Sequence, residues 1–216
     1  MDLDDIHKLE SVVNKGRPVE RGAHIYFDND KFEAVFAVRT GSFKTYRLTD
    51  AGTEQVTGFY LPGEIFGMDG MATDNHTESA AALETSSVCS IPFERLADLG
   101  CGIPSLRKNI VHLMGKEIED DRKLIGLICN NTSEQRMATF ILSLSQRYST
   151  RGYSSINIRL PMSRGDIASY LGLTPETVSR VLNKLRKLSL IAIDNKELEI
   201  RNMEGLKELT FESQET

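Results

Sequence analysis

The sequence is poor in cysteine, and the few cysteines that it has exclude two kinds of cysteine chemistry. Cys89, Cys101 and Cys129 are widely spaced and odd in number, so they form neither a disulfide framework nor a CxxC metal clamp. Because free cysteine behaves as a small apolar residue, we expect three buried free thiols. The histidines also lack the spacing of metal ligands, and no metal site is predicted from His7, His24, His76 and His112.

Long apolar runs and catalytic motifs are missing too. No apolar stretch approaches the length that spans a bilayer, and the start MDLDDIHKLE is acidic where a signal peptide is basic and then apolar. We therefore expect a cytoplasmic protein without a membrane partner. The sequence contains no GxSxG, HExxH, P-loop or Cys-His-Asn arrangement, so an enzyme is not expected.

The sequence has no excess of positive charge. Its formal net charge is −5 over 216 residues, and 40% of the residues are hydrophobic. This composition is typical of a globular protein and not of a disordered chain. It argues against a surface coated with basic residues, although binding of nucleic acid needs only one local basic face.

Short β-type segments separated by glycines occupy residues 17–92. These segments are HIYFD, AVFAVRTG, SFKTYRLT, EQVTGFYLPG and SSVCSIP. Glycine turns at this spacing indicate an antiparallel roll, barrel or sandwich. We place this β domain at residues 1–102.

A long helix is predicted next, because the apolar period changes to steps of four and three. The residues in this pattern are Met114, Ile118, Asp121, Ile125 and Ile128. This is a heptad seam of the kind that pairs with a second copy of itself, and it predicts a dimerisation helix at 103–131 in a homodimer. The third domain then covers 132–216.

Asp121 is a charge in this apolar seam. In a parallel homodimer its two copies face each other, and like charges in a partly desolvated seam oppose association. One hypothesis is that Asp121 keeps pairing weak until a signal shifts the helix, so that Asp121 turns outward or meets Arg122 or Lys123. The alternative is a solvated residue at the rim of the seam.

The third domain begins with a helix start at Ser133, Glu134 and Gln135, after the interruption NNTSEQ. An extended segment SINIRLPM, two short helices and a hairpin LIAIDNKELEIRN follow, and we expect the hairpin to turn at Asp194 and Asn195.

The two short helices meet at a glycine corner. Ser163 and Asp166 have the spacing of a capping box that starts the first helix, and Gly172 suits the left-handed conformation that ends it. Thr174 is then the N-cap of the second helix, and Pro175 occupies its first position. This arrangement predicts a helix-turn-helix.

The second helix separates an apolar face from a polar one. The predicted buried face consists of Val178, Val181, Leu182, Leu185 and Leu188. Arginine can bond both acceptors of guanine, a carboxylate can accept from cytosine, and cations pair with phosphates. We therefore predict DNA binding by Arg164, Thr174, Glu176, Thr177, Ser179, Arg180 and Lys184. The alternative is a solvated helix pair with an exposed Glu176–Arg180 ion pair.

The stretch RGDIASYLGLTPETVSR resembles the DNA-binding signature of the CRP/FNR superfamily of bacterial transcription regulators, and specifically its FNR branch. The segments AVRTGSFKTY, GTEQVTGFYLPGEIFGMD and ALETSSVCSIPFERL extend the likeness over nearly the whole chain. The resemblance implies an α+β fold: an N-terminal antiparallel β-roll of the cyclic-nucleotide-binding type as sensor, a long dimerisation helix and a C-terminal winged helix-turn-helix. It also implies that Glu176, Ser179 and Arg180 contact a TTGAT-type half-site of an inverted repeat.

The resemblance carries two further implications for ligands. In members that bind cyclic AMP, an arginine and a serine hold the phosphate, and the matching pair here is Glu78 and Ser79, although Gly63 and Glu64 of the roll are present. A carboxylate repels a phosphate, so cyclic AMP is not expected. In members with an iron-sulfur cluster, one cysteine lies in the roll, where Cys89 stands, and the other ligands lie in an N-terminal extension. One thiolate cannot hold such a cluster.

Two interpretations of the missing ligands stay open. Either the lineage has lost the cluster, or a cysteine-bearing segment precedes Met1 and the protein is an FNR-type oxygen sensor. The leading function is a dimeric, sequence-specific transcription regulator. The resemblance also implies RNA polymerase as a partner that touches the hairpin TDAGTE, around Asp50 to Glu54, and the alternative is a plain turn. A ligand-binding regulatory subunit of an enzyme is the alternative from another class, but it leaves the helix-turn-helix unexplained.

Overall fold

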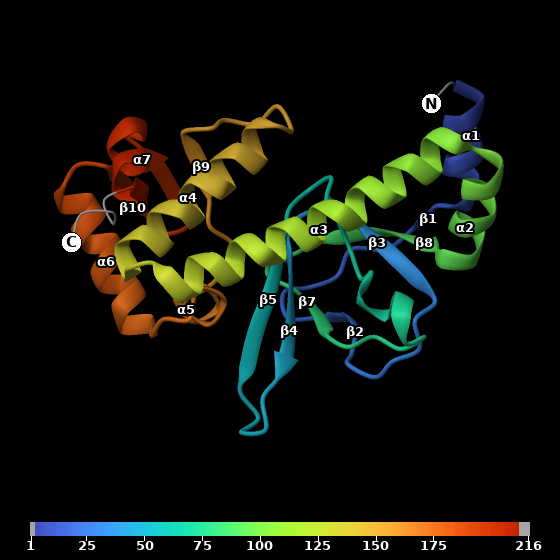
Figure 1. Cartoon of the computed structure of the whole chain (residues 1–216), viewed down its shortest axis with the longest axis horizontal. Coiled ribbons are helices and arrows are strands. Elements are labelled where there is room, and N and C mark those ends of the chain that lie inside the picture. Colours follow the sequence, from blue (N-terminus) through green and yellow to red (C-terminus); the bar gives the residue numbers. More distant parts are fainter. Residues whose placement is uncertain (1–2, 212–216) are drawn as a thin grey trace. The chain divides into compact units, whose positions relative to one another are not determined.

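The computed structural model describes residues 3–211, and the chain divides into two compact units, Met1–Asp121 and Arg122–Thr216. The first unit is an all-antiparallel β-roll with helices at its ends, and the second contains four helices around a small sheet (Figure 1). The expected α+β fold is therefore confirmed. Within the described residues, no helix has the length and apolar character that crossing a membrane requires.

Two four-stranded sheets form the roll, in the orders β1-β8-β3-β6 and β2-β7-β4-β5. The strands are β1 (Asn14–Lys15), β2 (His24–Tyr26), β3 (Ala34–Thr40), β4 (Phe43–Leu48), β5 (Glu54–Tyr60), β6 (Ile65–Phe66), β7 (Ser79–Ala82) and β8 (Ser87–Pro92). The helices of this unit are α1 (Leu3–Val12), the short 3-10 helix η1 (Asp69–Ala72), α2 (Phe93–Gly102) and the first part of α3 (Pro104–Asn130).

Aromatic side chains fill the space inside the roll. Phe43 and Phe66 have no exposed surface, and their rings stack with centroids 5.3 Å apart. Tyr26, Val38 and Val88 complete the same cluster. A second apolar cluster around Phe32, Leu96 and Leu106 joins α2 and the start of α3 to the roll. Burial of this kind contributes about 1.5–3 kcal/mol for each large apolar side chain and fixes the roll as a support for α3.

Carboxylates are half-buried where α3 crosses the roll. Tyr60 on β5 donates a hydrogen bond to Glu117 on α3 across 3.3 Å. Glu78 accepts from Thr57 at 2.8 Å and pairs with Arg47 at 3.4 Å. Burial raises the pKa of Glu117 to about 7, and the nearby charges of Asp121, Glu78 and Asp69 add to this rise. Burial also raises the pKa of Glu78.

Helix α3 leaves most of the predicted seam open to solvent. Met114, Ile118 and Ile125 are 41%, 54% and 62% exposed, and Val111, one step earlier on the same heptad face, is 63% exposed. Asp121 is exposed on this helix. Its pKa is raised, first by partial desolvation and then by Asp120, while Arg47 of the roll opposes the rise.

The second unit contains the end of α3 and α4 (Ser133–Ser149), β9 (Asn157–Arg159), α5 (Arg164–Leu171), α6 (Pro175–Lys187), β10 (Ile191–Asp194), β11 (Glu197–Ile200) and α7 (Met203–Phe211). Its sheet has the order β10-β11-β9. Fully buried side chains of α4, α5 and α6, including Leu144, Ile167 and Leu185, form its core. This core fixes the positions of α5 and α6 relative to each other.

Several local predictions need correction. Leu188 is 53% exposed, because α6 ends at Lys187 and the chain turns away there. The hairpin turns at Asn195 and Lys196, since Asp194 still pairs with Glu197. The predicted helix start at Ser133 is confirmed, and Thr132 is the N-cap of this helix.

The expectation of three buried thiols is also wrong. Cys101 and Cys129 are exposed, and Cys89 is half-buried. Cys101 belongs to α2, and Cys129 lies near the end of α3. Neither apolar cluster of the first unit includes a cysteine, so its core is built without thiols.

Substitution of Gly172 by alanine should destabilise the second unit. Gly172 has φ +61°, and an added Cβ would lie 3.3 Å from Ile128 Cγ2. We expect a loss of about 1–2 kcal/mol in the free energy of unfolding, measured by urea denaturation. Gly165→Ala is the control, because Gly165 lies in α5 without a positive φ and its added Cβ has room. Equal stability of the two variants would contradict the explanation.

Glu117 should make the stability of the protein depend on pH. An acid whose pKa is raised on folding binds its proton more tightly in the folded state, so stability falls as pH rises from about 4.5 to about 7. We expect Glu117→Gln to remove part of this fall in urea denaturation followed across that range. Glu94→Gln, an exposed change on α2, should leave the fall intact. The same pH profile for wild type and Glu117→Gln would refute the assignment.

Candidate nucleic-acid interface

The corner between α5 and α6 has the capping geometry expected from the sequence. Ser163 Oγ accepts from the amide of Asp166 at 3.0 Å, and the Asp166 carboxylate accepts from the amide of Ser163 at 2.8 Å. At the other end, the Leu173 amide donates to the Ala168 carbonyl at 2.9 Å around the left-handed Gly172. Thr174 Oγ1 then accepts from the amide of Thr177 at 3.2 Å. Both helix starts are therefore fixed by local hydrogen bonds.

Two side chains from outside the motif hold this corner in place. The guanidinium of Arg136, on α4, donates to the carbonyls of Leu171 and Gly172 at 3.1 and 3.2 Å and to Asn131 at 3.0 Å. Ile128, near the end of α3, packs against Gly172. The sequence analysis missed Arg136, since its contacts span 35 and 36 residues and no local pattern indicates them.

Helix α6 presents the predicted faces, apart from Leu188. Val178, Val181, Leu182 and Leu185 are buried against the unit. Glu176, Ser179, Arg180, Asn183 and Lys184 are exposed. Thr177, predicted on the polar face, is half-buried beside its cap. The exposed polar side chains form a continuous stripe along a rigid helix.

Glu176 and Arg180 do not pair with each other in the described part of the chain, so the solvated ion pair considered above is not formed. The pKa of Glu176 is lowered by hydrogen bonds from its own backbone amide and from Thr174. The carboxylate therefore stays ionised at the start of α6. Arg180 is exposed and its five donors are available to a ligand.

Other predicted residues have internal contacts. Ser179 Oγ donates to the Pro175 carbonyl at 2.9 Å, so its hydroxyl oxygen faces outward as an acceptor. Lys184 donates to Glu134 Oε1 on α4 at 3.0 Å, and this hydrogen bond is the main cause of the lowered pKa of Glu134. Lys184 is exposed, and its ion pair with Glu134 links α6 to α4.

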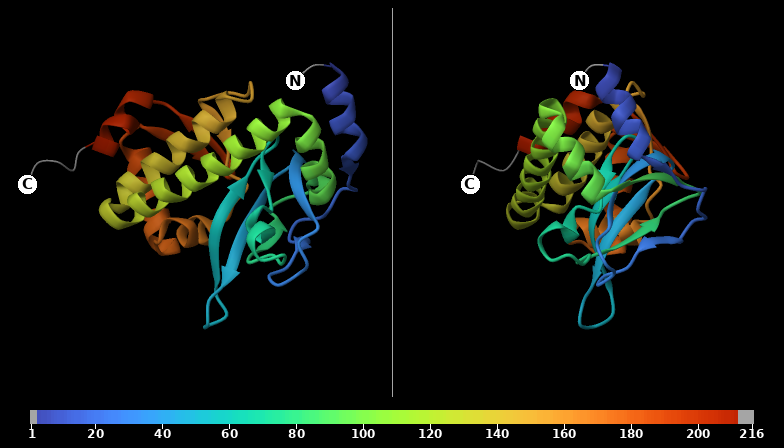
Figure 2. Two further views of the ribbon diagram at one scale, coloured as in Figure 1. Left: turned by 45° about the vertical axis from the view of Figure 1, so that its right-hand side comes forward. Right: turned by 90° about the vertical axis from the view of Figure 1, so that its right-hand side faces the viewer.

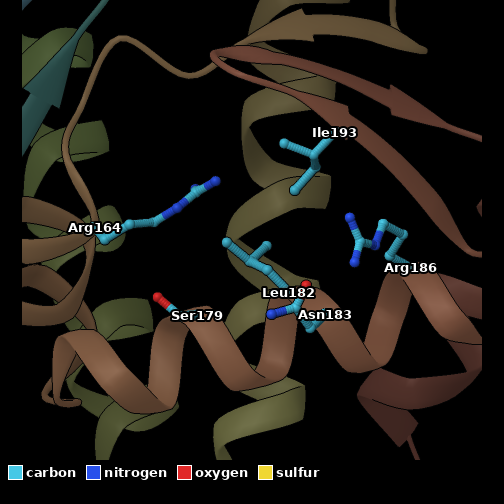
Figure 3. A pocket seen from close by; sticks show the side chains of 6 residues that line it. All are labelled: Arg164, Ser179, Leu182, Asn183, Arg186 and Ile193. Carbon is cyan, nitrogen blue, oxygen red and sulfur yellow. The ribbon is translucent and has the colours of Figure 1, made fainter.

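Arg164 lies at the first position of α5 and lines a hollow beside α6 (Figure 3). Its side chain is half-buried, and this burial lowers the pKa of its guanidinium. The other residues of the hollow are Ser179, Leu182, Asn183, Arg186 and Ile193. Asn183 and Arg186 are both exposed on α6.

The described residues of the roll do not suit either cofactor associated with similar sequences, cyclic AMP or an iron-sulfur cluster. Glu78 is engaged by Thr57 and Arg47, and Ser79 Oγ accepts from the amide of Asp28 at 3.0 Å. Among the described residues, no group of three or more histidine, cysteine or acidic side chains has the geometry of a metal site. Cys89, Cys101 and Cys129 lie on β8, α2 and α3, so the described residues do not fit an iron-sulfur cluster.

Comparison with known families and proteins agrees with this geometry. Residues 135–209 match the Crp-like helix-turn-helix domain, and residues 16–100 match the cyclic nucleotide-binding domain. The transcriptional activator protein Anr of Pseudomonas protegens is 46% identical over 200 residues, which cover 93% of this chain and 82% of that protein. The fumarate and nitrate reduction regulatory protein of Escherichia coli is 40% identical over 205 residues, covering 95% and 82%.

The similarity extends to solved structures. FixK2 from Bradyrhizobium japonicum superposes with a TM-score of 0.84 at 28% identity, over 92% of this chain and 97% of that one. These relatives are transcription regulators and not enzymes. The chain therefore belongs to the CRP/FNR family and is a transcription regulator of the FNR/Anr type that binds DNA through its helix-turn-helix.

Proposed function

We propose that the chain recognises an inverted repeat of TTGAT-type half-sites as a homodimer, through the exposed start of α6. The observation that carries this proposal is the combination of an unpaired Arg180, an ionised Glu176 and an outward Ser179 on one capped helix. A recognition helix places its N-terminal residues against base edges in the major groove. These three side chains lie within that part of α6.

The chemistry of each side chain suits this half-site. TTGAT and its complement contain one G·C pair, and Arg180 can donate to O6 and N7 of the guanine while Glu176 accepts from the amino group of the cytosine. The Ser179 oxygen can accept a hydrogen bond from a base. Arg164, Thr174 and Lys184 lie around these positions and contact the phosphates, and Thr177 supports the cap of the helix.

Pairing of two chains through α3 is supported by the exposed stripe of Val111, Met114, Ile118 and Ile125. A row of large apolar side chains at heptad spacing is buried when two copies of the helix associate. Two recognition helices then enter successive major grooves about 34 Å apart, which explains a palindromic operator. Asp121 lies in the same row and opposes this association by its charge.

RNA polymerase is the proposed partner of the β4–β5 hairpin. The hairpin projects beyond the rest of the roll in both views of Figure 2, and its residues from Leu48 to Glu54 are exposed. Hydrogen bonds between Thr49 and Thr53, with Gly52 at φ +74°, give the tip a defined shape. An exposed and ordered tip of this kind can dock on another protein.

The signal that acts on the roll is proposed to be neither cyclic AMP nor a cluster held by the described residues alone. Glu78 brings a negative charge to the position that matches the phosphate-binding arginine of similar proteins, and Thr57 holds it there. Two negative charges in a partly buried site repel each other. Cys89 on β8 supplies a single cysteine sulfur, so a cluster would need further ligands from outside the described residues.

Arg180→Ala should weaken binding to a TTGAT-N4-ATCAA duplex far more than binding to random DNA. Loss of a bidentate contact to guanine costs about 1–3 kcal/mol in each half-site. Fluorescence anisotropy with both duplexes at one fixed salt concentration measures the two losses. Arg201→Ala, an exposed change outside α6, is the control with the same change in charge. Equal losses on both duplexes would exclude Arg180 as a base-reading residue.

Asp121→Ala should strengthen the dimer. Removal of two facing charges lowers the dimer dissociation constant by about tenfold, which equals about 1.4 kcal/mol. Sedimentation equilibrium measures this constant. Asp98→Ala removes an exposed charge on α2 and should leave the constant unchanged. An unchanged constant in Asp121→Ala would remove Asp121 from any control of pairing.

A further inference from the structure

The hollow beside α6, which we call the arginine hollow, is lined by Arg164, Ser179, Leu182, Asn183, Arg186 and Ile193. Figure 3 shows Arg164 and Arg186 entering it from opposite ends, with Ser179 and Asn183 along the exposed side of α6 between them. Leu182 and Ile193 form its apolar wall. Two guanidinium groups therefore share one open cavity.

Neither arginine has a compensating negative charge in the part of the chain that the structure describes. Arg164 is half-buried and Arg186 is exposed, and no carboxylate of the described residues forms an ion pair with either. Partial burial of an unpaired charge is unfavourable, and a second like charge in the same hollow adds to the cost. A bound anion offsets both effects, so the hollow is built for an anionic ligand.

Two nearby ammonium groups have partners within the protein. The ammonium of Lys196, in the turn of the β10–β11 hairpin, donates to the Pro161 carbonyl at 3.1 Å. Asn195, the other residue of this turn, is uncharged. Lys184 pairs with Glu134. Arg164 and Arg186 are the cations that line the hollow itself.

The position of the hollow identifies the source of the anion. Ser179 lies both in the proposed base-reading group and in the lining of the hollow. An anion in the hollow is therefore next to the bases that Ser179 and Arg180 contact. In duplex DNA, the anions that lie beside a base read by the protein are the phosphates of the same half-site.

We propose that the arginine hollow binds one DNA phosphate, clamped between the guanidinium groups of Arg164 and Arg186, with the Asn183 amide as a further donor. This inference rests on the proposed recognition of the half-site by α6 and adds a phosphate site to it. Arginine forks suit phosphate oxygens, which accept two parallel hydrogen bonds from one guanidinium. The clamp fixes how far α6 enters the groove.

Arg186→Gln tests the clamp. We expect it to weaken binding to the TTGAT-N4-ATCAA duplex and to random DNA by similar factors, roughly 10- to 100-fold for a dimer at low salt. The slope of log K against log salt concentration should fall by about 0.9 for each bound protomer. Arg201→Gln changes the same charge on the exposed end of the sheet and should leave the slope unchanged. Circular dichroism checks that both variants are folded.

A second experiment identifies the phosphate. Duplexes that carry one methylphosphonate at successive positions lose one phosphate charge at a time. We expect one position in each half-site at which the methylphosphonate weakens binding by wild type. At that position it should weaken binding by Arg186→Gln only slightly further. Because Arg164 binds the same phosphate, Arg164→Gln and Arg186→Gln together should cost less than the product of their separate factors.

The outcomes separate this inference from the proposed function. Specific binding by wild type, with an unchanged salt slope in Arg186→Gln, overturns the clamp and leaves recognition by α6 standing. Independent, multiplicative effects of the two arginine variants also overturn it, because they mean two separate phosphates. If wild type does not distinguish the TTGAT duplex from random DNA, recognition of this half-site fails, and the clamp that rests on it fails too.

Discussion

The left-handed backbone of Gly172 is the constraint on which the DNA-binding unit depends. At φ +61° it ends α5 and redirects the chain, so that Thr174 can cap α6 three residues before Thr177. Arg136 holds the two carbonyls at this corner, and Lys184 holds the middle of α6 to α4 through Glu134. The exposed stripe of α6 is thus oriented by one backbone conformation and two long side chains.

The β-roll contacts its own part of α3 through polar side chains. Here the contact is polar: Tyr60 donates to Glu117, and Glu78 lies nearby with its charge shared between Thr57 and Arg47. Each carboxylate is partly desolvated, which raises its pKa, and the charge of Glu78 adds to the rise at Glu117. A contact of this kind depends on the charge state of its carboxylates, unlike packed apolar surface.

Much of the helix-turn-helix could be predicted because its determinants are local. Capping boxes, the glycine corner and the proline at the first helical position all act within a few residues. The predictions that failed concern residues at element ends or in solvent, such as Leu188 and the hairpin turn. Helix α2, with an apolar face that includes Leu96 and Leu99, and strand β7, with three consecutive alanines, also escaped prediction.

Features that depend on distant parts of the chain could not be predicted. Arg136 reaches across 35 residues to Leu171, and the arginine hollow joins the start of α5 to the end of α6 and to β10. Exposure of Cys101 and Cys129 follows from which face of a helix the core happens to cover. In each case the residue type was visible in the sequence, but its neighbours were set by tertiary packing.

The Ile128 side chain belongs to the predicted seam of α3 and also lies at the Gly172 corner. It occupies the last position of the predicted seam, and its Cγ2 lies 3.3 Å from the place where a larger residue at Gly172 would put its Cβ. In the proposed homodimer, a change that improves the fit between two α3 helices at this point also presses on, or loosens, the corner behind it. Position 128 is therefore a poor place to tune oligomerisation alone, and variation that adjusts pairing has more freedom nearer the start of the helix, at Val111 or Met114.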